Sequence, residues 1–193
     1  MGGIHYSSVQ SIFDELNFVD DRPIWSSIQP IQYAITPTSP EELQAKYSRI
    51  DDTWKGKPAF SDLTSLFGDA NVRQKIKKIV CFGLGTMQQP HDMSARSFLQ
   101  HAIIKSIADA LGGNVPIFLQ DPAYTGNDTN LVSGLGMTVV NDPKGFLQVD
   151  TQTLVVAVAP DIPLRQIIAD LAEPAAMIWK GVVPPEEEAI AMG

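Results

Sequence analysis

From about Lys75 onward, short apolar runs rich in β-branched residues alternate with segments of helical periodicity. The runs are IKKIVCF at 76–82, PIFLQ at 116–120, MTVV at 137–140, TLVVAV at 153–158 and AMIW at 176–179. This alternation is the signature of repeated β-α-β units, whose strands lie side by side and point the same way. We therefore predict an α/β protein with a Rossmann-like, mostly parallel sheet flanked by helices.

The segments between these runs predict the connecting helices. Ser94 is a suitable N-cap for a helix that reaches Leu111, where Gly112 follows and can end it. Shorter helices are predicted at about 129–135 and 163–172, and a short edge hairpin at 145–149. His101 falls inside the first of these helices, where we expect it to be half-buried and without a role.

The chain divides into three parts of different character. Residues 1–74 hold many Pro and Ser and only short periodic pieces, at 8–16, 40–47 and 61–67. We expect this part to be an irregular, partly helical N-terminal extension that packs on the core. Residues 75–181 form the Rossmann-type domain, and residues 182–193, which include three consecutive glutamates, are expected to be an exposed acidic tail.

Charge and cysteine content bear on partners and compartment. The 22 Asp and Glu outnumber the 14 Lys and Arg, so the phosphate backbone of a nucleic acid would meet a repulsive mean field, and no nucleic-acid partner is expected. The single cysteine, Cys81, cannot form an internal disulfide, which favours a reducing compartment, the cytoplasm or the nucleus. No apolar run approaches the roughly 18 residues that cross a bilayer, so no membrane association is expected.

The loop after the first predicted strand is the first candidate binding site, because ligands of open parallel sheets gather outside the carboxyl ends of the strands. Gly83 and Gly85 form a turn there that lets backbone amides face a ligand. The loop lacks the dinucleotide fingerprint, since Gln88 stands where a third glycine belongs and the helix does not begin at once. A tight strand exit with no ligand is the alternative interpretation.

Two further segments complete the predicted rim. Asp121 ends the second strand, where nucleotide-binding and methyl-donor-binding folds often place a carboxylate on ribose hydroxyls; an exposed turn aspartate is the alternative. Ser94 and Arg96 begin the long helix, whose N-terminal amides and guanidinium could hold an anion, unless they are only a cap and a surface arginine. The candidate cofactor-binding residues are Gly83, Gly85, Thr86, Ser94, Arg96 and Asp121.

His91 and Asp161 are the candidate catalytic residues. His91 lies in the glycine loop, where a histidine can transfer protons near neutral pH, although loop histidines are often only solvated. Asp161 follows the fourth strand, either on the ligand-facing rim or as a helix cap. No histidine and carboxylate cluster has the spacing of metal ligands, so no metal site is expected.

Five pieces of the chain, in their order and spacing, carry a family resemblance. They are Val80 to Gly85, the Ser94-Ala95-Arg96 helix start with Gln100, Asp121-Pro122 with Tyr124, the segment 135–139, and the strand 153–159 followed by Pro160. Together they resemble the domain family named for sensitivity to red light reduced, the SRR-like domain. Where that family often ends its fourth strand in Pro-His-Cys, this chain has Ala159-Pro160-Asp161.

The resemblance implies a Rossmann-like domain in cytoplasmic or nuclear proteins of light signalling, circadian regulation and, in other branches, haem metabolism. These are processes and not a reaction, so the resemblance transfers no catalytic residues. Two functions stay open: a regulatory or interaction module that binds a protein partner or a small nucleotide-type ligand, and a small-molecule enzyme, a transferase or oxidoreductase, using the same rim. The candidate ligands are NAD(P), S-adenosylmethionine and haem, none supported by a complete motif.

Overall fold

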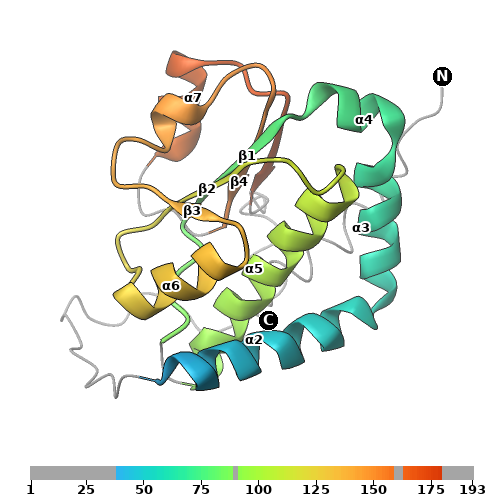
Figure 1. Ribbon diagram of the computed structural model, residues 1–193. Coiled ribbons are helices and arrows are strands. Elements are labelled where there is room, and N and C mark those ends of the chain that lie inside the picture. The colour runs from blue at the N-terminus through green and yellow to red at the C-terminus, as the bar shows by residue number, and fades with distance from the viewer. Residues whose placement is uncertain (1–37, 89–90, 159–162, 180–193) are drawn as a thin grey trace, which may run out of the picture.

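The computed structural model describes residues 38–88, 91–158 and 163–179 (Figure 1). Along the chain its elements are α2 (Pro40–Lys55), α3 (Pro58–Gly68), α4 (Ala70–Lys75), β1 (Lys78–Phe82), α5 (His91–Ala110), β2 (Ile117–Gln120), α6 (Gly126–Gly134), β3 (Thr138–Val139), the 3-10 helix η1 (Phe146–Gln148), β4 (Thr153–Ala157), α7 (Leu164–Leu171) and β5 (Ala176–Trp179). The periodic piece at 8–16 and the predicted acidic tail at 182–193 lie outside the described residues.

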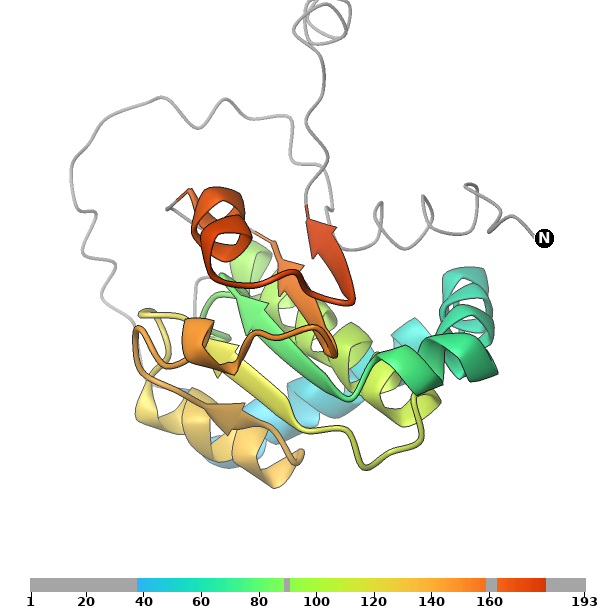
Figure 2. The same ribbon diagram turned by 90° about the horizontal axis from the view of Figure 1, so that it is seen from above.

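The five strands form one sheet in the order β3-β2-β1-β4-β5, and every neighbouring pair is parallel. The predicted parallel α/β sheet is thereby confirmed, and its strand order is that of Rossmann-like folds. Strand β1 lies at the centre, with Val80 opposite Phe118 of β2 on one side and Val155 of β4 on the other. Seen from above, the strands lie side by side between two helical layers (Figure 2). The order changes direction between β1 and β4, where ligand crevices form in such sheets.

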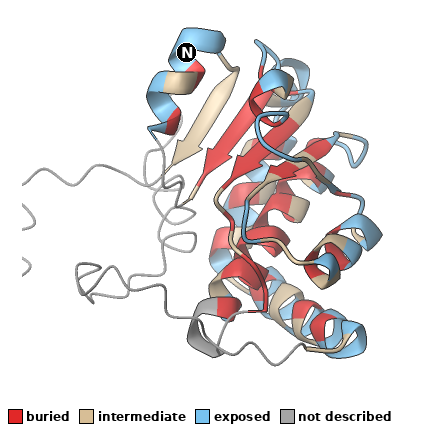
Figure 3. Ribbon diagram, turned by 90° about the vertical axis from the view of Figure 1, so that its left-hand side faces the viewer, coloured by how far each residue is buried: buried red, intermediate tan, exposed pale blue. Residues whose placement is uncertain are grey.

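The two faces of the sheet carry separate hydrophobic clusters, because side chains alternate along each strand. Ile79 and Cys81 of β1 belong to the larger cluster, under α2, α3, α5 and α6. Val80 and Phe82 point the other way, into a smaller cluster with α7 and η1. The central strands are buried on both faces, whereas all of β5 is only half-buried (Figure 3).

Helix α2 joins the N-terminal part of the described chain to the larger cluster. It begins with a capping box in which the Ser39 hydroxyl accepts from the Glu42 amide and the Glu42 carboxylate accepts from the Ser39 amide. Trp54, near its end, is fully buried and donates from Nε1 to the Ser106 hydroxyl of α5 over 3.0 Å. The predicted packing of residues 40–47 on the core is seen here as part of a longer helix.

Two local predictions are wrong. Helix α5 begins at His91, so Ser94 lies inside the first turns of the helix with a buried side chain and is not its N-cap. Residues 145–149 do not form an edge hairpin, because Gln148 donates its amide to the Gly145 carbonyl and closes the turn of η1. The ring of Phe146 stacks on that of Phe82 at 4.8 Å, which buries η1 against the sheet.

Candidate functional site

The glycine loop after β1 is held in a fixed bend. Gly83 and Gly85 have φ angles of 70° and 73°, a left-handed conformation that glycine adopts without strain. Between them, the side chain of Leu84 turns inward and is 2% exposed. The Val158 amide donates to the Phe82 carbonyl over 3.2 Å, so the end of β4 lies beside the start of this loop.

Asp121 ties this loop to the end of β2. Its Oδ2 accepts from the Gly85 amide over 2.7 Å, and its Oδ1 accepts from the Ala123 amide over 2.8 Å. The structure therefore brings Gly83, Gly85 and Asp121 to one rim of the sheet, as the sequence predicts. It also gives the Gly85 amide a partner within the protein.

A second carboxylate, that of Asp128, forms hydrogen bonds with the next two residues of the loop, Thr86 and Met87. Its side chain is fully buried and accepts from the Thr86 hydroxyl over 2.6 Å and from the Met87 amide over 2.9 Å. The same carboxylate accepts from the amide and the hydroxyl of Thr125, each over 2.8 Å. Thr86, a predicted ligand contact, thus directs its hydroxyl into the protein.

Sequence reasoning missed Asp128, although one signal for it was present. Thr125 caps α6 by accepting from the Asp128 amide, and the Asp128 carboxylate accepts in return from the Thr125 amide. This is the spacing of a capping box, which places Asp128 in the first turn of a helix. That the carboxylate also reaches Thr86 and Met87 of the glycine loop depends on the tertiary fold.

The buried His101 and the half-buried Tyr124 form a hydrogen-bonded pair at the same rim. His101 is fully buried, with Nδ1 2.6 Å from the Ser97 carbonyl and Nε2 2.7 Å from the Tyr124 hydroxyl. Because a carbonyl can only accept, Nδ1 carries the proton and Nε2 accepts from the tyrosine. Burial lowers the pKa of His101 and raises that of Tyr124, so both groups stay neutral. The expectation of a half-buried histidine is wrong: this one links α5 to the segment after β2.

The start of α5 lies against the glycine loop, since the Ser97 hydroxyl donates to the Leu84 carbonyl over 2.7 Å. Arg96, one residue earlier, is half-exposed, and Ser94 is buried. His91 is the first residue of α5, but its side chain lies outside the described part. Asp161 is likewise outside it. The placement of these two candidate catalytic residues stays a prediction.

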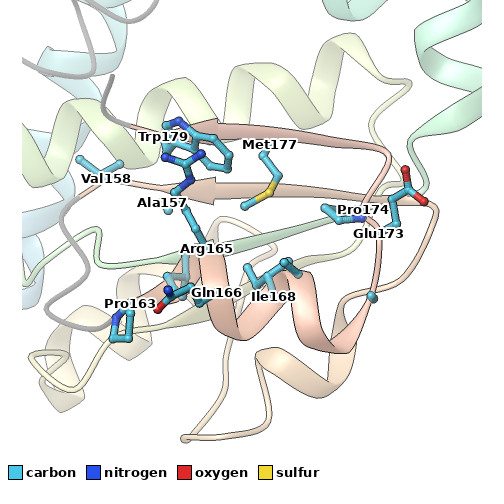
Figure 4. Close-up of a pocket in the computed structure, with 13 residues that line it drawn as sticks. Ala157, Val158, Pro163, Arg165, Gln166, Ile168, Glu173, Pro174, Met177 and Trp179 are labelled. Atoms are coloured by element: carbon cyan, nitrogen blue, oxygen red, sulfur yellow. The ribbon is translucent and has the colours of Figure 1, made fainter. Parts of the chain in front are cut away.

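A groove of about 920 Å³ lies on the other helical face, between α7 and the strands β4 and β5. The guanidinium of Arg165 lies 4.1 Å from the centre of the Trp179 ring at this groove (Figure 4). No sequence motif signals the pair, because α7 and β5 bring the two side chains together only in the folded chain.

Residues 38–88, 91–158 and 163–179 hold no cluster of three or more potential metal ligands. Nor does any helix within those ranges have the length and apolar character needed to span a membrane.

The sequence model of the SRR1 domain matches residues 40–183. The chain belongs to the SRR1 domain family. The match includes α2, α3 and α4 as well as the sheet, so the SRR1 region takes in two helices that lie within residues 1–74, α2 and α3, and most of α4. Searches of the curated proteins and of the solved structures returned no match.

Proposed function

We propose that this SRR1-domain protein is a regulatory or interaction module that binds a small nucleotide-type ligand at the carboxyl-end rim of its sheet. The observation that carries the proposal is the change of strand order between β1 and β4, directly beside the bend at Gly83 and Gly85. Open parallel sheets bind ligands at this position. We further propose the cytoplasm or the nucleus as its location, in line with its buried thiol Cys81.

Asp121 supports a ligand with ribose-type hydroxyl groups. A carboxylate offers about four lone-pair sites, and the hydrogen bonds from the Gly85 and Ala123 amides use only two of them. The remaining sites can accept from a pair of hydroxyl groups on a ligand above the rim. The half-exposed Arg96 lies near the loop and supplies a positive charge for a phosphate group.

The internal pairing of polar groups favours binding over catalysis. A general acid or base must come within hydrogen-bond reach of its substrate. Asp128 is instead fully buried and occupied by Thr86, Met87 and Thr125. His101 is likewise enclosed between Ser97 and Tyr124. These groups give the rim a fixed shape, which suits a module that recognises a ligand without converting it.

A thermal-shift panel on the full chain tests the proposal with NAD(P), ATP, S-adenosylmethionine and haem as probes. A ligand at about 100 times its dissociation constant adds about 2.7 kcal/mol of stability. We expect one nucleotide-type probe to raise the melting temperature, and Asp121→Ala to remove the shift. Asp109→Ala, which removes an exposed carboxylate of α5, is the matched control and should keep it. If no probe stabilises the chain, the nucleotide-type ligand is excluded.

An enzyme is the second candidate, favoured by the half-exposed Tyr124 whose hydroxyl contacts the neutral His101. A substrate over Tyr124 could exchange a proton through this pair. Incubation with the stabilising probe and chromatography of the products distinguishes the two functions. Turnover that Tyr124→Phe abolishes, with binding retained, would establish the enzyme; an unchanged probe would support the binding module.

A further inference from the structure

The groove between α7 and β5 is a second concave surface, and its Val158 lies beside the start of the glycine loop. It shares no lining residue with the Gly83–Asp121 region, and its volume of about 920 Å³ falls in the range of roughly 300–1,000 Å³ typical of small-molecule sites. Most of its lining is apolar. The side chains that shape it are Arg165, Ile168, Ala169, Ala172, Met177 and Trp179.

Side-chain size explains why the groove stays open. Helix α7 covers β4 with Leu164 and Ile168, which are 2% and 1% exposed. Further along the helix, Ala169 and Ala172 lie toward the groove and carry only methyl groups, so space remains beside Met177. Strand β5 is at the edge of the sheet and half-buried throughout.

Arg165 gives one end of this apolar groove a positive charge. Its guanidinium stacks on the Trp179 ring at 4.1 Å, a contact that orients the group and leaves its N–H donors free for another acceptor (Figure 4). Within the described part of the chain, no ion pair involves Arg165. In a chain with a formal charge of −8, this is a local positive site that attracts an anion.

Glu173 lines the groove near the other end of α7. A carboxylate there repels a second negative charge on a bound molecule. The groove therefore combines one cation, an apolar wall and one anion along its length. This arrangement is complementary to a molecule with a single anionic head and a hydrocarbon body, and it disfavours polyphosphates.

We propose that the groove binds an apolar carboxylate. The head accepts two N–H bonds from Arg165, the geometry that guanidinium and carboxylate groups favour. The hydrocarbon body lies on Met177 and fills the space beside Ala169. Burial of its methylene groups contributes most of the affinity.

Isothermal titration of the full chain with dodecanoate tests this assignment. We expect saturable binding by the wild type and a loss of affinity of about tenfold in Arg165→Gln, because the head group loses its charged partner. Arg49→Gln removes an exposed arginine of α2 and is the matched control, with affinity unchanged within about twofold. Dodecyltrimethylammonium, with the same body and the opposite charge, should bind at least about tenfold more weakly than dodecanoate.

Ala169→Phe provides an independent variant, because it fills the groove and keeps Arg165. It should abolish dodecanoate binding while the circular dichroism spectrum stays that of the wild type. The proposal is overturned by an absence of saturable binding to the wild type. It is equally overturned by equal affinities of the wild type and Arg165→Gln, or by tighter binding of the cationic probe.

Discussion

The two halves of the sheet use their side chains in opposite ways. On the β1–β2 side, two carboxylates and a histidine are joined to loop amides and hydroxyl groups, and the strands pack under helices α2, α3, α5 and α6. On the β4–β5 side, one short helix covers the face, and a groove with Arg165 and Trp179 remains open to solvent. On the β1–β2 side, these polar groups bond to one another and hold the loops in place. On the β4–β5 side, the groove leaves surface that a ligand can contact. Substitutions on the two sides should therefore change the free energy of unfolding by different amounts.

The largest difference is expected between two tryptophans, one in each half. Trp54 is fully buried and hydrogen-bonded to Ser106, so Trp54→Ala should lower the free energy of unfolding by about 4 kcal/mol. Trp179 is half-buried at the edge strand, and Trp179→Ala should cost about 1.5 kcal/mol or less. Urea denaturation of both variants measures the difference. Equal losses would mean that the β5 edge is as firmly packed as the α2 side.

The next largest loss of stability is expected when the Asp128 carboxylate, which holds the glycine loop, is removed. Asp128→Ala leaves the donors of Thr86, Met87 and Thr125 without their buried acceptor and breaks the capping box of α6, so we expect a loss of about 3 kcal/mol. The matched change is Asp109→Ala, which breaks an exposed ion pair with Lys105 and should cost at most about 0.5 kcal/mol. A small effect of Asp128→Ala in urea denaturation would show that the loop does not depend on this residue.

Sequence periodicity predicted the strands well because each is a short run of apolar residues between turn signals. The prediction of Ala176 to Trp179 matches β5 at both ends. The pairing of His101 with Tyr124 could not be predicted, since it requires α5 and the segment after β2 to meet in the fold. The same holds for Arg165 over Trp179. Local patterns therefore located the rim, and tertiary contacts decided which of its groups are occupied.

A smaller effect concerns the pH dependence of the free energy of unfolding that is due to His101, on the β1–β2 side. Burial lowers its pKa below the ordinary value of 6.5, so the unfolded chain takes up the proton first as pH falls. Stability from this group is full above pH 6.5 and is lost as pH falls toward the folded-state pKa. The slope reaches at most about 1.4 kcal/mol per pH unit. Urea midpoints at about pH 7.5 and pH 5.5 should therefore differ more for the wild type than for His101→Phe. Parallel losses in both proteins would assign the pH dependence to other groups.

The smallest effect is expected at Arg165, and its smallness is informative. The side chain is exposed and stacks on Trp179, so Arg165→Gln should change the free energy of unfolding by about 0.5 kcal/mol. Arg73 is a contrasting arginine, because its Nε donates to the Leu111 carbonyl at the end of α5 over 3.2 Å in a partly buried position. Arg73→Gln should cost about 1–2 kcal/mol in urea denaturation, since a charged hydrogen bond is lost. If Arg165→Gln proved the more costly of the two, Arg165 would be part of the structural core of the β4–β5 half. A small loss of stability in Arg165→Gln would therefore agree with a role of Arg165 in binding a ligand and not in folding.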